Sequence, residues 1–148
     1  MDDVDLAYFA GCIDSDGCIS VARSPVSNYD THTFHECVVL GQVIPVVPYM
    51  LLERFGGAVN LRKTKAHTHR DLFVWTAKAL KANRMLVDIL PYLHIKREQA
   101  LNCIELRRVM DASKRHYKRR LRYTRQMERL HRVSRALNRR GTLDGEAV

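Results

Sequence analysis

The chain has 148 residues, of which 46% are hydrophobic, enough for one domain with a substantial core. It contains no apolar run near the ~20 residues that cross a membrane, and its acidic start, MDDVD, is unlike a secretory signal. The net charge of +9 is concentrated in residues 107–140, where 14 lysines and arginines accompany two acidic residues, so we expect a polyanionic partner, most often nucleic acid.

The first half of the chain predicts two helices that flank a β-hairpin. Apolar residues recur at helical spacing near the N-terminus, where Asp3 or Asp5 can cap a helix that ends before Gly17. Alternating residues then predict two paired strands joined by a turn-rich connection. Prolines tolerated in a first helical turn and the Gly56-Gly57 pair bound the second helix. The predicted elements are residues 4–14, 18–23, 34–43 and 45–55.

The second half predicts another hairpin followed by helices. Its elements are strands at 58–64 and 71–77 and helices at 79–90, 96–110 and 112–140. This order predicts an α+β domain, with one antiparallel sheet and helices on one face. We expect a core domain over residues 1–110, a basic helical extension over 111–140 and a disordered tail over 141–148. The amphipathic extension should dock on the core or on nucleic acid, or be disordered without a partner.

The stretch FAGCIDSDG, residues 9–17, places Asp14 and Asp16 at the end of the first predicted helix. The small pair Ala10-Gly11 offers a flat surface, and packing it against a second copy would bring both helix ends together. The gathered carboxylates would repel one another and oppose the helix dipole unless divalent cations neutralised them. Oxygen ligands suit a hard ion such as Mg²⁺, and two ions ~4 Å apart can assist phosphodiester hydrolysis. The simple alternative is a turn in which the aspartates bind backbone amides.

This stretch resembles the signature of the LAGLIDADG homing endonucleases, with six of its nine positions identical. Residues 41–59 resemble the second helix of that family with its preceding glutamine, and residues 90–108 resemble its late lysine-bearing segment. The resemblance implies an αββαββα domain with a saddle-shaped antiparallel sheet. It implies site-specific cleavage of double-stranded DNA and a role in intron or intein mobility. A chain with one motif implies a homodimer acting at a palindromic or pseudo-palindromic site.

The resemblance also implies roles for individual residues. Asp16 is the expected metal ligand and Asp14 the second choice, for Mg²⁺ or for Mn²⁺ or Ca²⁺ at the same site. Gln42 would orient water near the scissile phosphate, and Lys96 would offset developing charge there. Asp16, Gln42 and Lys96 thus form the expected catalytic set. The expected contacts between the first helices of two chains are Phe9, Ala10, Gly11 and Ile13.

The family resemblance places the sheet in the major groove of DNA, where base edges distinguish all base pairs. Arg62 is the expected guanine contact. Strand alternation predicts that four side chains face the core: Ile19, Val21, Val59 and Leu61. The expected DNA-contacting residues are Ser20, Arg23, Ser24, Asn28, Tyr29, Asn60, Arg62, Lys63, Thr64, Lys65 and Arg70.

An alternative function is binding without cutting by a protein of the same fold, such as an intron maturase or a transcription regulator. The arginine-rich extension keeps RNA open as a further partner, and no membrane partner is expected. Four cysteines without a CxxC pair favour a reducing compartment. We therefore expect the cytoplasm of a bacterial or phage-type host, or an organelle interior, and not secretion.

Overall fold

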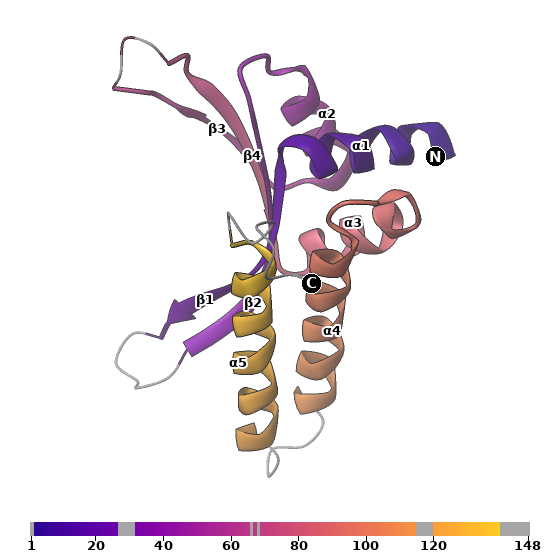
Figure 1. Cartoon of the computed structure of the whole chain (residues 1–148), viewed down its shortest axis with the longest axis vertical. Helices are drawn as coiled ribbons and strands as arrows, with labels where there is room; N and C mark the ends of the chain where they lie inside the picture. Colours follow the sequence, from indigo (N-terminus) through magenta and orange to yellow (C-terminus); the bar gives the residue numbers. More distant parts are fainter. Residues whose placement is uncertain (1, 27–31, 66, 68, 115–119, 140–148) are drawn as a thin grey trace, which may run out of the picture.

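A computed structural model describes residues 2–26, 32–65, 67, 69–114 and 120–139 of the protein (Figure 1). The elements are α1 (Asp3–Asp16), β1 (Gly17–Pro25), β2 (His32–Gln42), α2 (Val46–Phe55), β3 (Ala58–Arg62), β4 (Leu72–Lys78), α3 (Leu80–Ile89), the 3-10 helix η1 (Leu90–Tyr92), α4 (Arg97–Lys114) and α5 (Arg120–Leu137). They follow the predicted order, and the α+β fold class is confirmed. No helix in this described part of the chain is long and apolar enough to span a membrane.

One antiparallel sheet organises the domain, with its strands in the order β1-β2-β4-β3. Side chains alternate between its faces, so that Ile19, Val21 and Val38 are buried whereas Ser20 and Ala22 lie on the other face. Figure 1 shows the β1–β2 and β3–β4 hairpins diverging from each other, with α1, α3 and α4 on the opposite side. Within the described residues, the sheet therefore has one face covered by helices and one open face.

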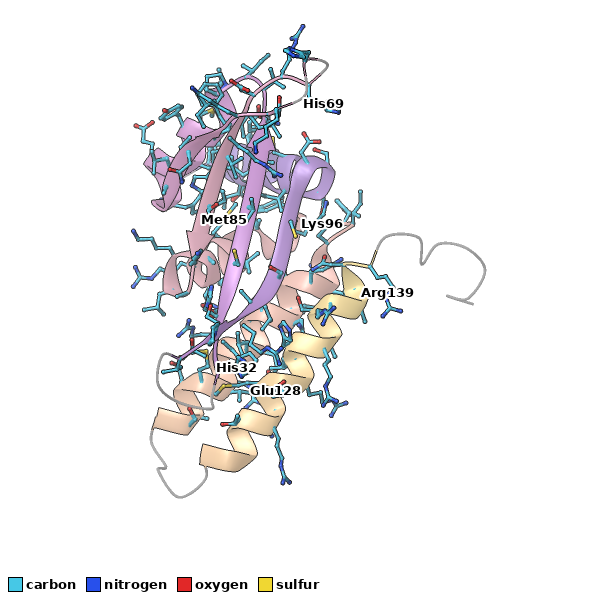
Figure 2. The ribbon with its side chains drawn as sticks, turned by 90° about the vertical axis from the view of Figure 1, so that its left-hand side faces the viewer. His32, His69, Met85, Lys96, Glu128 and Arg139 are labelled. Atoms are coloured by element: carbon cyan, nitrogen blue, oxygen red, sulfur yellow. The ribbon has the colours of Figure 1, made fainter. Side chains whose placement is uncertain are left out.

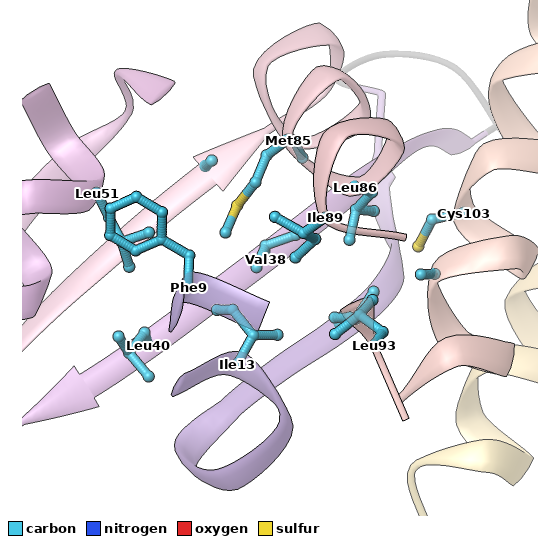
Figure 3. Close-up of a cluster of buried hydrophobic side chains, with 14 of the residues drawn as sticks. Phe9, Ile13, Val38, Leu40, Leu51, Met85, Leu86, Ile89, Leu93 and Cys103 are labelled. Atoms are coloured by element: carbon cyan, nitrogen blue, oxygen red, sulfur yellow. The ribbon is translucent and has the colours of Figure 1, made fainter. Parts of the chain in front are cut away.

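The core lies between the sheet and the helices (Figure 3). Met85, Leu86 and Ile89 share one face of α3 and are fully buried. Phe9 and Ile13 lie one helical turn apart on α1 and pack into the same core. Because complete burial of such a side chain stabilises a fold by about 1.5–3 kcal/mol, these two faces determine how α1 and α3 lie on the sheet.

A buried ion pair joins the sheet to α4. The Arg107 guanidinium donates to both carboxylate oxygens of Glu36, from Nε at 2.7 Å and from Nη2 at 2.6 Å. Glu36 on β2 is fully buried, and this hydrogen bonding raises the pKa of Arg107. Loss of either partner would leave the other charge buried and unpaired, at a cost of about 3–5 kcal/mol. The pair therefore holds α4 firmly against the sheet.

The basic C-terminal segment is part of the domain. α4 continues to Lys114, four residues beyond the predicted end of this helix at residue 110. α5 packs on α4 and along β1, an edge strand whose outer backbone groups would otherwise lack partners. The Val21 amide donates to Ser134 Oγ at 2.9 Å, and Asn138 Nδ2 donates to the Ile19 carbonyl at 2.8 Å. The tail over 141–148 lies outside the described residues.

Two local predictions need correction. Asp2, and neither Asp3 nor Asp5, caps α1, because its carboxylate accepts a hydrogen bond from the Val4 amide at 3.3 Å. Leu61 is 48% exposed although alternation placed it in the core. Among the five residues of the edge strand β3, only Val59 is not exposed. Leu61 therefore follows the alternating pattern, but its side chain has little to pack against at this edge of the sheet.

Candidate functional site

Asp16 and Gln42 come together at the C-terminal end of α1. Asp16 is the exposed last residue of α1, and Gln42 is the last residue of β2. Gln42 Nε2 donates a hydrogen bond to Asp16 Oδ2 at 3.2 Å. The chain passes directly from α1 into β1 at Gly17, where a Cβ would lie 2.8 Å from the Ile13 backbone. Glycine thus permits the tight turn that brings the carboxylate next to the end of β2.

Asp14 has the opposite environment, although it is only two residues away. It is buried, and its Oδ2 accepts hydrogen bonds from the His94 and Ile95 amides at 2.8 and 3.2 Å. Its Oδ1 accepts from the Lys96 amide at 2.9 Å. Burial alone would raise the pKa of Asp14, but these three bonds and the Lys96 charge outweigh it and lower the pKa below its usual value. Asp14 therefore stays ionised and ties α1 to the segment that leads into α4.

Lys96 strengthens the same junction. Its ammonium Nζ donates to the Ile13 carbonyl at 2.9 Å and to the Asp14 carbonyl. These carbonyls belong to the last turn of α1, where backbone acceptors lack helical partners and the dipole is negative. α1 has no basic residue of its own in that turn. Lys96 therefore caps α1 and holds a positive charge near the exposed Asp16. Figure 2 shows Lys96 at the side of the sheet, between the end marked by His69 and the end marked by His32.

The open face of the sheet carries polar and small side chains from all four strands, together with the apolar residues Val39, Leu72 and Val74. Strand pairing sets Ala22 of β1 opposite His35 of β2, and Cys37 of β2 opposite Lys78 of β4. Burial, with a further effect of the Lys78 charge, lowers the pKa of His35, so its imidazole is neutral near pH 7. A neutral imidazole can both donate and accept hydrogen bonds. The polar residues of this face are Ser20, Ser24, Thr33, His35, Thr76, Lys78, Asn60 and Arg62.

Four residues of this face were missed from the sequence: Thr33, His35, Thr76 and Lys78. The alternation in β2 and β4 was visible, but the side on which each strand presents its residues depends on the register. Pairing of Ser20 with Cys37 and of Cys37 with Lys78 places all three on one face. Sequence patterns that define single strands do not supply these pairings.

Several expected DNA contacts are placed elsewhere. Arg23 points to α5, where its Nη1 lies 3.6 Å from Glu128 Oε2, and it remains 40% exposed, so its expected phosphate contact stays a prediction. Thr64 is used within the β3–β4 connection, because its amide donates to Asp71 Oδ1 at 3.0 Å and its hydroxyl to the His69 carbonyl at 2.7 Å. Three cations of that connection are exposed, as a phosphate-binding role requires: Lys63, Lys65 and Arg70. Asn28 and Tyr29 lie outside the described residues.

The expected helix contact must be shifted to another side of α1. Phe9, Ala10 and Ile13 are buried in the core of their own chain and cannot line a contact with a second copy. Gly11 lies on the opposite, exposed side, and a Cβ added there would meet no atom within 4 Å. The reason is that the most apolar stripe of α1 is needed by the sheet. The spacing of Val4, Tyr8 and Gly11 was the sequence signal for the outward side.

Exposed apolar side chains lie on the outward side of α1 and in the two segments that meet its C-terminal end. Val4 is 69% exposed and Tyr8 50%. Val43 and Ile44 are exposed directly after Gln42, and Ile95, which precedes the capping Lys96, is 73% exposed. We call these five residues the apolar collar. Exposed apolar groups gathered around one structural feature are typical of a protein–protein contact.

The described part of one chain does not contain a complete metal site. Among the residues that the structure describes, no group of three histidine, cysteine, aspartate or glutamate side chains is arranged to hold an ion. Asp16 offers one exposed carboxylate, and Asp14 already accepts three backbone hydrogen bonds. Carboxylate oxygen suits a hard divalent cation, so the donor type fits, and further ligands would have to come from a second chain, DNA or water.

Comparison with solved structures identifies the fold. The homing endonuclease I-CvuI in complex with its target, in the presence of 2 mM Ca, matches with a TM-score of 0.70 and 19% identity over 91% of this chain and 82% of that chain. The archaeal intron-encoded homing endonuclease I-Vdi141I, complexed with DNA, matches with a TM-score of 0.74 and 16% identity over 95% and 88% of the two chains. The chain therefore has the homing-endonuclease fold.

A third match adds the family name. I-GzeII, a LAGLIDADG homing endonuclease in complex with its DNA target, matches with a TM-score of 0.67 and 10% identity over 85% of this chain and 43% of that chain. The LAGLIDADG fold implied by the sequence is thus confirmed. No model of a known protein family and no curated protein sequence matches the chain.

Proposed function

We propose that this protein is a homodimeric, site-specific endonuclease that cleaves double-stranded DNA with the aid of divalent cations. The observation that carries the proposal is the exposed Asp16 carboxylate, hydrogen-bonded to Gln42 at the end of α1, beside an open polar sheet. The buried counterpart Asp14 and the capping Lys96 hold that helix end in place. A protein that only bound nucleic acid would have no need for an exposed carboxylate held in this way.

The second copy would pack on the outward side of α1. Gly11 allows close approach of two helices, and the apolar collar around it would be removed from water. A two-fold contact uses the same surface on both chains and would bring one Asp16 from each to a shared centre. The match to I-GzeII supports this arrangement, because the present chain corresponds to less than half of that protein. Two-fold symmetry then favours a palindromic or pseudo-palindromic target.

Asp16 from each copy would hold the cation, with Mg²⁺ the expected ion and Mn²⁺ or Ca²⁺ able to occupy the same site. The ion would supply Lewis-acid stabilisation of the phosphodiester oxygens. I-CvuI has been determined with DNA in the presence of 2 mM Ca and of 2 mM Mg, which supports this donor–ion pairing. Gln42 would orient water beside the Asp16 carboxylate, and Lys96 would add positive charge near the scissile phosphate. We assign Asp14 to support of the site rather than to metal binding.

The open sheet face would lie in the major groove. Ser20, Asn60 and Arg62 retain their predicted place on this face, and His35 and Thr76 join them as candidate base contacts. Lys63, Lys65 and Arg70 in the β3–β4 connection would bind backbone phosphates and set the register of the protein on DNA. Such a protein would act where DNA is accessible, in a cytoplasm or an organelle interior.

Selection of cleaved sites from a plasmid library tests the proposal directly. With Mg²⁺ present, the purified chain should cut both strands at a small set of sites with two-fold symmetry, and EDTA should abolish the cutting. Sedimentation of the protein on its selected site should give two chains per DNA. Binding to selected DNA without cutting in Mg²⁺ or Mn²⁺ would instead support the same-fold binding protein.

The dimer can be tested separately at Gly11. Gly11→Leu has room for its side chain within one chain and removes a helix-breaking residue, so the fold should be retained. The larger side chain should separate two packed α1 helices and leave the protein monomeric. Arg84→Leu, at an exposed position of α3, is the matched control and should remain dimeric. A Gly11→Leu protein that still dimerises and cuts would show that α1 is not the contact.

A further inference from the structure

α5 runs along the outer edge of the sheet. Glu128 pairs with Arg23, Ser134 accepts from the Val21 amide, and Asn138 donates to the Ile19 carbonyl. The residue numbers rise on α5 as they fall on β1, so the helix is antiparallel to the strand over several residues. His131 adds a further contact, with its Nδ1 2.9 Å from the Val21 carbonyl. α5 is therefore packed along the outer edge of β1 and is held there by side chains that point toward the strand.

The other sides of α5 have different neighbours. Leu130 and Val133 face α4, where they line a hollow together with Glu105 and Val109. The Leu130 carbonyl also accepts a hydrogen bond from Asn102 of α4 at 2.9 Å. Because α4 covers the helix-packed face of the sheet (Figure 1), the side of α5 turned away from α4 is the side adjacent to the open face.

Arginines occupy that remaining side. At 3.6 residues per turn, positions 125, 132 and 135 lie on one side of α5, opposite the side that contacts α4, and Arg139 follows two residues after the helix end. Arg125, Arg132, Arg135 and Arg139 are all exposed. Arg132, Arg135 and Arg139 line an open hollow of about 540 Å³ together with Ala136, and no acidic side chain is among the described residues of its lining. Figure 2 shows Arg139 beside the C-terminal end of α5, away from the sheet. We call these four residues the arginine row.

The dimensions of the arginine row suit a DNA backbone. A helix rises 1.5 Å per residue, so the part of the row from Arg125 to Arg135 on α5 extends over about 15 Å, and one DNA strand carries a phosphate every ~3.4 Å of helix axis. A sheet that fills the major groove has a phosphate backbone along each of its edges, and α5 lies along the β1 edge. Guanidinium groups bind phosphate oxygens in pairs. The arginine row thus matches a DNA phosphate backbone in position, in charge and in length.

We propose that α5 is a rim that binds the DNA backbone bordering the groove occupied by β1 and β2. This inference rests on the proposed function, since it requires the open sheet face to lie on DNA. The rim would contribute affinity for any sequence, because phosphates carry no base information. The sheet would supply the choice of site. α5 would also keep β1 in place while it contacts bases, through the backbone bonds from Ser134 and Asn138.

The salt dependence of DNA binding tests the rim. The double variant Arg132→Gln, Arg135→Gln removes two charges from the arginine row without touching the residues that contact β1. The slope of log K against log salt is negative, and its magnitude should become smaller by about 1.8 for target and for random DNA alike. The preference for target over random DNA should be kept. The control Arg54→Gln, Arg84→Gln removes the same charge from exposed positions on α2 and α3 and should leave the slope close to that of the wild type.

The outcomes separate this inference from the proposed function. An unchanged slope in the Arg132, Arg135 variant, or an equal decrease in the control variant, would overturn the rim even if the wild type cuts its site. A decreased slope in a protein that cuts no DNA would keep the rim and reject the nuclease. Selective loss of binding to an RNA hairpin competitor, with DNA binding unchanged, would show that the arginine row is an RNA surface and would overturn the proposal.

Discussion

The two aspartates at the end of α1 stand two residues apart in the same chain and have opposite surroundings. On the inner side of the helix end, Asp14 is buried and accepts three backbone hydrogen bonds from residues 94–96. On the outer side, Asp16 is exposed and accepts a hydrogen bond from the Gln42 side-chain amide. The comparison shows that a carboxylate is a structural anchor where backbone donors surround it and stays accessible to other ligands where they do not.

The largest effect on cleavage is expected from substitution of the exposed Asp16. Asp16→Asn removes the proposed metal ligand with little change in shape, so cleavage should fall by at least about a thousandfold. DNA affinity in Ca²⁺ and the melting temperature should stay near the wild-type values. Ser15→Ala, between the two aspartates, is the matched control and should cut at close to the normal rate. Full cutting by the Asp16→Asn protein would remove this residue from the mechanism.

Substitution of the buried Asp14 should reduce the stability of the fold more directly than it reduces cleavage. Asp14→Asn keeps a carbonyl oxygen but loses the negative charge that accepts three amide hydrogen bonds, so the free energy of unfolding should fall by about 2 kcal/mol. Urea denaturation measures this change. Cleavage should decline only to the extent that the helix end becomes misplaced. If Asp14→Asn left stability unchanged but abolished cutting, the contrast between the two sides would be broken and Asp14 would join the metal ligands.

The pH dependence of stability sharpens the same point. The pKa of Asp14 is lower in the folded protein than in the unfolded chain, so its contribution is fully present above the unfolded pKa of about 3.9 and is lost as the pH falls through the lower folded value. The stability difference between wild type and Asp14→Asn should therefore be constant from pH 5 to 7 and shrink below about pH 4. A difference that persisted unchanged at pH 3 would contradict the proposed anchoring by the charged form.

The smallest effect is expected at Gln42. Gln42→Ala removes the amide beside Asp16 but leaves the carboxylate and its position, so cleavage should fall by about tenfold. Single-turnover cutting at saturating protein separates this change from weaker binding. Gln42→Glu is an informative companion, because a second carboxylate near Asp16 should alter the metal requirement more than the fold. A Gln42→Ala protein with an unchanged single-turnover rate would show that Gln42 takes no part in cleavage and would leave Asp16 as the only functional residue of this pair.

The course of the chain was largely predictable because it depends on local patterns. Apolar spacing, glycine stops and strand alternation located the helices and strands to within a few residues. The resemblance of FAGCIDSDG to a family signature led to the fold, which the solved structures confirm. It also led to the choice of Asp16 and Gln42 as site residues, and the structure places their side chains within hydrogen-bonding distance. Their catalytic roles stay predictions.

Several features that sequence reasoning missed involve side chains whose neighbours are distant in sequence. Phe9, Ala10 and Ile13 were expected at a contact between chains, yet the sheet of their own chain covers them. The ion pair of Arg23 with Glu128, more than a hundred residues later, was not foreseen. Periodicity identifies an apolar side of a helix but does not tell which surface buries it.

The amino-acid sequence by itself determined the elements, their order, the paired aspartates and the density of positive charge near the C-terminus, because these depend on near neighbours along the chain. Only the tertiary structure decided that Asp14 is an anchor, that Lys96 caps α1, and that α5 borders β1 with its arginines turned outward. These facts depend on strand register and on packing between residues far apart in the chain, where many pairings are compatible with the same local pattern and the buried contacts select one.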